Sequence, residues 1–294
     1  MFTGSLVAMV TPFDRHNRVD YGSLKRLIDF HVAEGTNGLV IAGTTGESAT
    51  LDRAEHVELI VRAVEISAGR LPIIAGTGSN STAQTIKVSV AVGDAGIDAY
   101  LLVVPYYNKP VQEGLFRHFS AIADAVDKPV MLYNVPGRTG ADLLAETVAR
   151  LAKHDNIFGI KEATGDMDRL KKIQELVDDD FMFYSGDDFT ALSFMEQGGH
   201  GVVTVSGNVV PAQMARLCRL AVSGEHEAAT ALDDTLQPLN TALFVESNPI
   251  PVKWAVSQMG LIPPDIRLPL TEHAAQYHDG MRIAMAGAGV ELAA

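Results

Sequence analysis

Several residue types that define other protein classes are nearly absent from this sequence. Its 294 residues include one cysteine, Cys218, which excludes an intrachain disulfide framework and a zinc or iron–sulfur site built from several cysteines. No stretch approaches the ~18 apolar residues that a membrane-spanning helix needs. The first residues lack a basic lead and carry only a short apolar run, so no secretory signal is expected. These absences predict a cytoplasmic, reduced location, with Cys218 as a small residue in a helix core.

Positive charge is scarce as well. The chain has 23 Lys and Arg against 36 Asp and Glu, which gives a formal net charge of −13 and a pI near 5.0. Such a surface repels phosphate backbones and anionic lipid headgroups, and no dense basic run offsets it. Nucleic acid and membranes are therefore not expected as partners. The 47% of hydrophobic residues is enough for a substantial globular core.

Short apolar runs recur along the first two thirds of the chain, each bounded by Gly, Pro or Asn. Most of their residues are Val, Ile, Leu or Tyr with little alternation, which is typical of parallel strands covered on both faces. There are eight such runs, at residues 6–13, 38–44, 71–78, 99–107, 129–136, 157–164, 181–188 and 199–208.

Helical periodicity fills most of the intervals between these runs. In the first interval, for example, Leu24, Leu27, Ile28 and His31 fall on one helical face. Eight strand–helix units predict an α/β fold of the TIM (β/α)8 barrel type, and the count of eight favours it over a doubly wound open sheet. The last interval, residues 189–198, has room for only a short helix.

The strand pattern stops after residue 208, and the remaining sequence is helical in character. Helix starts are indicated at Pro211 and near residues 249–251, with a polar break at 223–225. We therefore predict a barrel domain over residues 1–224, which would hold any active site, and a C-terminal helical region over residues 225–294. The first of these helices would close the barrel.

Polar residues gather where the predicted strands end, which is the functional face of a parallel barrel. Lys161 is the most informative of them, because it follows an apolar run that should be buried. One interpretation is a structural ion pair with Glu162 or with an acid on the seventh strand. The other is a buried amine that attacks a carbonyl and forms a Schiff base. Tyr133, on the neighbouring strand, is either a core aromatic or a proton shuttle for the Lys161 amine. The hydroxyl groups nearby favour the Schiff base and the proton shuttle.

Two further segments of the rim carry possible anion-binding groups. Thr44 and Thr45 lie in a strand-to-helix turn whose amides and hydroxyls suit a carboxylate, although an ordinary glycine turn with capping threonines has the same sequence. Arg138 is either a solvated loop residue or a bidentate clamp on a carboxylate. The segment 76–80 lacks the G-x-G-x-x-G spacing of a nucleotide-binding loop and is interpreted as a tight turn.

No metal site is predicted. Asp187 and Asp188 are adjacent, but no His–Asp–Glu constellation converges with them. The histidines form no triad and no ligand spacing, a conclusion that covers His56, His118, His154 and His200.

Six rim motifs, taken in order and spacing, resemble the dihydrodipicolinate synthase family, also called 4-hydroxy-tetrahydrodipicolinate synthases, within the pyruvate-dependent class I aldolase superfamily. The similarity runs over essentially the whole chain. The motifs are GTTGE at 43–47, YYNKP at 106–110, YNVPGRTG at 133–140, GIKEA at 159–163, SGDD at 185–188 and NPIPVK at 248–253.

This resemblance implies roles for individual residues. Lys161 would form the Schiff base with pyruvate, while Tyr133, Thr44 and Tyr107 would relay protons, Tyr107 reaching in from a neighbouring subunit. The substrate-binding residues it implies are Thr45 for the pyruvate carboxylate, Arg138 for the carboxylate of aspartate semialdehyde, and the backbone at Gly186 and Val203.

The resemblance also implies a reaction, the condensation of pyruvate with aspartate semialdehyde in lysine biosynthesis. No cofactor is implied, because the lysine imine is itself the electron sink, and a homotetramer of two tight dimers is expected. An N-acetylneuraminate lyase or sugar-acid aldolase is the nearest alternative, but these enzymes should lack the Arg138-Thr139-Gly140 element. A non-catalytic barrel that senses a small acid is the alternative from another class, and it would need no buried amine.

Lysine-inhibited members of the family bind their effector at a dimer interface. Two positions here depart from the inhibited bacterial pattern, with Arg53 in place of a histidine and Gln84 in place of a glutamate. The family resemblance therefore implies weak or absent feedback inhibition. The candidate allosteric positions are Ser48, Ala49, Arg53, His56, Asn80, Gln84 and Tyr106.

Overall fold

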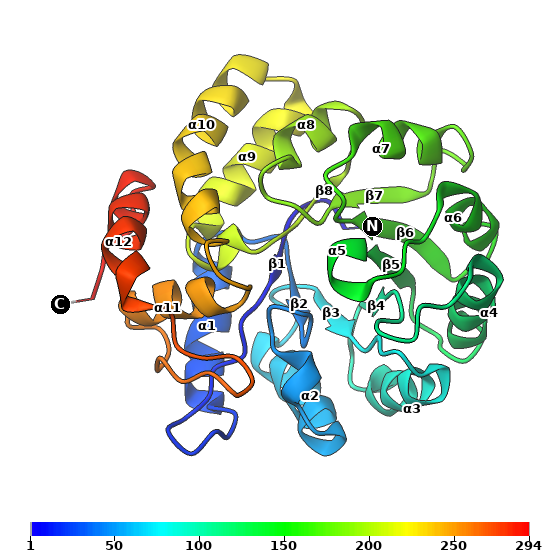
Figure 1. Ribbon diagram of the computed structural model, residues 1–294, viewed down its shortest axis with the longest axis horizontal. Coiled ribbons are helices and arrows are strands. Elements are labelled where there is room, and N and C mark those ends of the chain that lie inside the picture. The colour runs from blue at the N-terminus through cyan, green and yellow to red at the C-terminus, as the bar shows by residue number, and fades with distance from the viewer. Residues whose placement is uncertain (1, 294) are drawn as a thin grey trace.

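Eight parallel strands form a closed barrel in the computed structural model, which describes residues 2–293 (Figure 1). Each strand pairs with the next along the chain, and β1 pairs with β8, with Leu6 opposite Val203. This closure confirms the predicted barrel and excludes the open sheet. The strands are β1 (Gly4–Ala8), β2 (Gly38–Ile41), β3 (Ile73–Gly76), β4 (Ala99–Val103), β5 (Val130–Asn134), β6 (Ile157–Glu162), β7 (Met182–Ser185) and β8 (Gly201–Thr204).

Every strand falls on a predicted apolar run, although the strands are shorter than the runs. Only β1 begins earlier than predicted, at Gly4 rather than Leu6. The residues that follow most strands leave the sheet and form turns at the rim where the strands have their carboxyl ends. Apolar side chains inside the barrel, among them Leu6, Val40 and Met131, form an inner core separate from the larger core under the helices.

Helices surround the barrel, and four of them begin at a side-chain cap. Asp20, Asp52, Ser81 and Asp166 each accept hydrogen bonds from backbone amides in the first turn of the helix that follows. The surrounding helices are α1 (Tyr21–Ala33), α2 (Arg53–Ser67), α3 (Thr82–Gly93), α4 (Gln112–Ala123), α5 (Pro136–Thr139), α6 (Ala145–Leu151), α7 (Met167–Gln174), α8 (Ala191–Glu196) and α9 (Pro211–Ser223). As expected from the spacing, α8 is short.

The C-terminal part is helical. Helix α9 packs against β1 and completes the ring, and α10 (His226–Ala242), α11 (Ile250–Gln258) and α12 (His278–Gly287) lie outside it, beside α1 and α9 (Figure 1). Cys218 is buried in α9, where burial raises the pKa of its thiol to about 12. Between residues 2 and 293, no helix combines the length and the apolar character needed to cross a membrane.

Candidate active site

Lys161 and Tyr133 lie side by side inside the barrel, near the carboxyl ends of β5 and β6. They are paired in the register between β5 and β6, and both are almost fully buried. The Lys161 Nζ lies 4.1 Å from the centre of the Tyr133 ring. This contact places an amine and a phenol hydroxyl on one wall of the barrel interior, as the sequence predicted.

The structure does not support the alternative in which Lys161 is one half of an ion pair. Glu162 is buried on the opposite face of β6, where its carboxylate binds the Arg169 Nε at 2.9 Å and accepts from the Asn134 amide and the Thr164 N–H. Burial raises the pKa of Glu162 above its ordinary value, against the lowering effect of the Arg169 charge. Within residues 2–293, no carboxylate lies within 4.0 Å of the Lys161 amine. Among the residues that the structure describes, Lys161 is thus a buried amine without an anionic partner.

Gly186 leaves the space that the Lys161 side chain occupies. It follows β7, and a Cβ atom at this position would lie 2.6 Å from the Ala163 Cβ and 2.9 Å from the Lys161 Cε. Any larger residue would therefore displace the lysine stem. Val203, on β8, is buried among the side chains of the inner core.

The turn after β2 carries Thr44 and Thr45 and is held from several directions. Thr45 is 2% exposed, and its Oγ1 accepts a hydrogen bond from the Asn248 Nδ2 at 2.9 Å. The Thr11 hydroxyl donates to the carbonyl of Gly46 at 2.7 Å. The turn is therefore held by one residue from the N-terminal part of the chain and one from the C-terminal part.

A buried ion pair anchors the same turn to α11. The Lys253 Nζ lies 2.6 Å from Glu47 Oε1, and both side chains are 1% exposed. The second carboxylate oxygen of Glu47 accepts the backbone N–H of Arg267 at 3.2 Å. Burial lowers the pKa of Lys253 below its ordinary value, while the charge of Glu47 opposes the shift. The Lys253 amine also lies over the ring of Phe13, so its charge is satisfied without water.

Arg138 belongs to α5, the short helix that follows β5. Its Nη2 donates to the carbonyl oxygen of Asn248 at 3.3 Å. Asn248 therefore contacts both Thr45 and Arg138, through its side chain and its backbone respectively. The Arg138 side chain is nevertheless exposed to solvent, and this contact joins it to the segment before α11.

Tyr107 is not brought to Lys161 within one chain. Its side chain is 89% exposed, and its backbone has a φ of 74°, which a residue with a bulky side chain rarely adopts. The strained backbone is held by a hydrogen bond from the Tyr107 N–H to the carbonyl of Thr139 at 3.2 Å.

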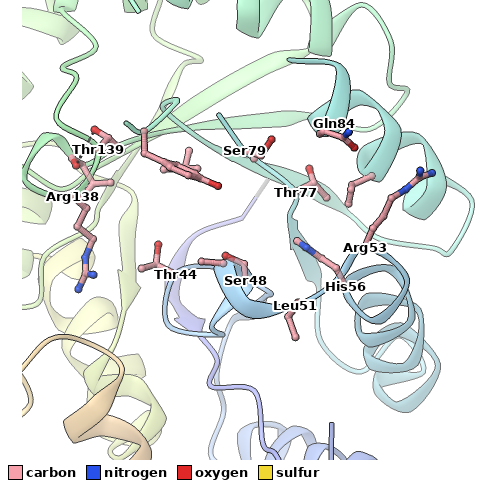
Figure 2. Close-up of a pocket in the computed structure, with 16 residues that line it drawn as sticks. Thr44, Ser48, Leu51, Arg53, His56, Thr77, Ser79, Gln84, Arg138 and Thr139 are labelled. Atoms are coloured by element: carbon pink, nitrogen blue, oxygen red, sulfur yellow. Dashed lines mark hydrogen bonds between the residues drawn. The ribbon is translucent and has the colours of Figure 1, made fainter. Parts of the chain in front are cut away.

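A cavity of about 420 Å³ opens beside these groups (Figure 2). Thr44 and Arg138 lie toward one end of it in Figure 2, and Arg53 and Gln84 toward the other, with Ser48 and Thr77 between. Lys161 and Tyr133 are not part of its wall. Six of the seven candidate allosteric residues line it, namely Ser48, Ala49, Arg53, His56, Gln84 and Tyr106. The seventh, Asn80, is outside the lining, and its carbonyl accepts the Asn108 side-chain amide.

The histidines have separate structural surroundings. His56 binds the carbonyl of Gly76 through Nε2 at 2.8 Å, and burial lowers the pKa of its ring. His118 contacts Thr82, and burial lowers its pKa to about 4. His154 pairs with Asp124, and His200 accepts the backbone N–H of Phe183.

The two adjacent aspartates also have local partners. Asp187 accepts from the Thr190 hydroxyl, while Asp188 accepts the amides of Val205 and Ser206. No three His, Cys, Asp or Glu side chains of the described chain gather in a way that would hold a metal ion.

The model of the dihydrodipicolinate synthetase family matches residues 1–286. The chain belongs to this family. The resemblance seen in the six sequence motifs is thereby confirmed.

Named relatives cover nearly the whole chain. The chain is 56% identical over 290 residues to a 4-hydroxy-tetrahydrodipicolinate synthase of Pseudomonas aeruginosa, covering 99% of both proteins. It is 53% identical to the enzyme of that name from Escherichia coli, covering 99% of this chain and 100% of the relative.

Solved structures also match nearly the whole chain. The chloride-inhibited dihydrodipicolinate synthase of Acinetobacter baumannii, complexed with pyruvate, matches with a TM-score of 0.97 and 47% identity, covering 99% of this chain and 100% of that one. The lysine-bound enzyme of Cyanidioschyzon merolae matches with a TM-score of 0.95 and 41% identity, covering 98% of each chain.

Sequence reasoning missed the residues that hold this family's motifs together. Asn248 and Lys253 stood in a motif without a role, and the structure gives them Thr45 and Glu47 as partners. Arg169, which was not singled out, bridges Glu162 and Asp142 below the rim. For Lys253 the signal was a charged residue in the otherwise apolar segment 249–256, whereas Asn248 and Arg169 gave no such signal.

Replacing Lys253 by methionine is expected to lower the free energy of unfolding by about 3–5 kcal/mol, because Glu47 would stay buried without its cation. The double substitution Glu47→Gln with Lys253→Met should recover much of this loss. Denaturant unfolding measures both values. The exposed pair of Lys25 with Asp29 supplies the control, since Lys25→Met should cost less than about 1 kcal/mol. Equal losses for Lys253→Met and the double variant would contradict the role of the pair.

Proposed function

We propose that the protein condenses pyruvate with L-aspartate 4-semialdehyde to give 4-hydroxy-tetrahydrodipicolinate, an early step of diaminopimelate and lysine biosynthesis. It is a lyase with class I aldolase chemistry. The observation that carries the proposal is the buried Lys161 amine, 4.1 Å from the Tyr133 ring and without an anionic partner among the described residues, in a chain that the family model matches over residues 1–286.

The first half of the reaction activates pyruvate. The Lys161 amine attacks C2 of pyruvate, and loss of water from the carbinolamine gives an iminium ion. Removal of a C3 proton then gives the enamine nucleophile. Each step moves a proton, and the hydroxyl groups of Tyr133 and Thr44, with Tyr107 of a neighbouring subunit, relay it. No cofactor is needed, because the protonated imine accepts the electron pair.

The second half joins the two substrates and releases the enzyme. The enamine carbon attacks the aldehyde carbon of the semialdehyde, whose oxygen takes up a proton and becomes the hydroxyl of the product. The amino group of the semialdehyde unit then attacks the imine carbon and displaces the Lys161 amine, which closes the six-membered ring.

Two carboxylates must be held during these steps. Thr45 hydrogen-bonds the pyruvate carboxylate next to Lys161, and the backbone at Gly186 and Val203 lines the same subsite. Arg138 binds the carboxylate of the semialdehyde, for which a guanidinium offers paired donors. Thr44 and Arg138 also line one end of the cavity (Figure 2).

The exposed Tyr107 completes the site only across a subunit interface. Its strained φ of 74° and its 89% exposure fit a side chain that is held outward for a partner chain. We therefore expect a homotetramer built from two tight dimers, acting in the cytoplasm. One related structure, a dihydrodipicolinate synthase variant that matches this chain with a TM-score of 0.96, is described as monomeric.

Pyruvate with borohydride is expected to add a reduced three-carbon unit to Lys161 and to no other lysine. Lys253 is the matched control, because it is equally buried but paired with Glu47. Mass spectrometry of peptides locates the adduct, and a coupled assay with aspartate semialdehyde measures turnover. Lys161→Arg should nearly abolish turnover, since a guanidinium stays protonated. No adduct in active protein would overturn the mechanism, and an adduct without turnover would favour a lyase of another substrate.

Replacing Arg138 by alanine is expected to raise the KM for aspartate semialdehyde far more than the KM for pyruvate. Loss of a charge-assisted contact should cost about 2–3 kcal/mol, which is roughly 30- to 150-fold. Initial rates at varied concentrations of each substrate measure this split. Arg117, exposed and paired with Glu113, provides the control variant Arg117→Ala. Equal effects on both substrates would instead indicate a structural role for Arg138.

Feedback inhibition by L-lysine is expected to be weak. Lysine carries two ammonium groups and one carboxylate, and in the cavity Gln84 offers no charge to an ammonium while Arg53 adds a cation. Losing one charge-assisted partner costs about 1.5–3 kcal/mol, or roughly 10- to 150-fold in affinity. Titration of lysine at neutral pH, with pyruvate near half-saturation, measures the inhibition. The double variant Arg53→His with Gln84→Glu should be inhibited more strongly, and half-inhibition of the parent below about 1 mM would refute the charge argument.

A further inference from the structure

Asn248 contacts both of the groups assigned to substrate carboxylates. Its side-chain Nδ2 donates to Thr45 Oγ1 at 2.9 Å, and its backbone carbonyl accepts from Arg138 Nη2 at 3.3 Å. The residue is 7% exposed and lies just before α11. One residue from outside the eight barrel units therefore touches the binding group of each substrate.

The direction of the Asn248–Thr45 hydrogen bond decides what Thr45 can do. A hydroxyl group has one proton to donate. Because the Asn248 amide donates to Thr45 Oγ1, the Thr45 proton is left free for another acceptor. With the bond reversed, Thr45 would spend its proton on Asn248 and could offer only lone pairs to a carboxylate, which would be repulsive.

The remaining atom of the side chain points to the same conclusion. Asn248 Oδ1 is buried and has no hydrogen-bond partner within residues 2–293. A buried amide oxygen without a partner is costly, and an asparagine with a purely structural role normally satisfies both of its ends. In the described part of the chain, Oδ1 therefore stays unpaired while Nδ2 of the same amide donates to Thr45.

We propose that Asn248 is a positioning residue that fixes the Thr45 hydroxyl as a hydrogen-bond donor to the pyruvate carboxylate. This inference rests on the function proposed above and adds a residue that acts on pyruvate binding through Thr45. Its backbone carbonyl steadies Arg138 independently of the side chain. Substitution of the side chain should therefore act on pyruvate and leave the semialdehyde subsite largely intact.

The test compares three substitutions of the pair. Asn248→Ala removes the donor and should raise the KM for pyruvate about 3- to 10-fold, the range for one neutral hydrogen bond. Asn248→Asp turns the donor into an acceptor that takes the Thr45 proton and adds a negative charge, so the increase should exceed about 30-fold. In a Thr45→Val background, Asn248→Ala should add no further increase. The KM for aspartate semialdehyde should change less than about twofold.

A second readout separates this proposal from the proposed function. The pyruvate concentration that gives half-maximal borohydride trapping at Lys161 reports pyruvate binding without the second substrate. Failure of the wild-type protein to trap pyruvate or to turn over the semialdehyde would count against the proposed function. The positioning proposal is tested by the half-maximal pyruvate concentration of each variant relative to that of the wild type.

Asn240 provides the matched control, because it is equally buried and contacts Ser206 and Asp188. Asn240→Ala should lower stability without changing half-saturation by pyruvate. The proposal is overturned if Asn248→Asp traps pyruvate as the wild type does, if Asn240→Ala shifts half-saturation equally, or if Asn248→Ala and Thr45→Val are additive.

Discussion

The buried ion pair between Glu47 and Lys253 is the contact on which the site depends. It joins the turn after β2 to α11, two segments 206 residues apart, and neither charge has access to water. A buried pair of this kind adds little net stability, but removing one partner leaves the other charge buried and uncompensated. The two segments must therefore fold together. The C-terminal helices are for this reason part of the site, although they lie outside the barrel. Thr44, Thr45 and Asn248 all take their positions from this junction.

The strand β6 carries the proposed nucleophile on one face and a supporting ion pair on the other. Neighbouring residues of a strand point to opposite faces, so Lys161 enters the barrel while Glu162 faces the helices. There Arg169 neutralises Glu162, which leaves the lysine inside the barrel without a competing carboxylate. A chain in which the two side chains paired with each other would lose the reactive amine. In the proposed mechanism the Arg169 network therefore matters because it holds Glu162 away from Lys161.

Features that depend on neighbouring residues in the sequence could be predicted, whereas contacts between distant segments could not. Strands buried on both faces need continuous apolar runs, so all eight could be predicted, and the residues after them had to meet at one rim. Pairing of Tyr133 with Lys161 followed from strand order alone. In contrast, Asn248 reaches Thr45 across 203 residues, and no spacing or periodicity reveals such a contact. The charge of Lys253 in the apolar segment 249–256 indicated a partner, but no pattern identified that partner as Glu47.

The cavity and the proposed catalytic groups share the turn after β2. Thr44 lies in the cavity wall together with Ser48 and Ala49, only a few residues away, and Glu47 between them is held by Lys253. A ligand in the cavity would press directly on a segment whose other side positions Thr45. Coupling between the two places then needs no long path through the barrel, since one short turn belongs to both. Because the buried pair holds Glu47 rigidly, however, such a ligand has little freedom to move the turn, and its effect on catalysis is limited to what its binding energy can displace.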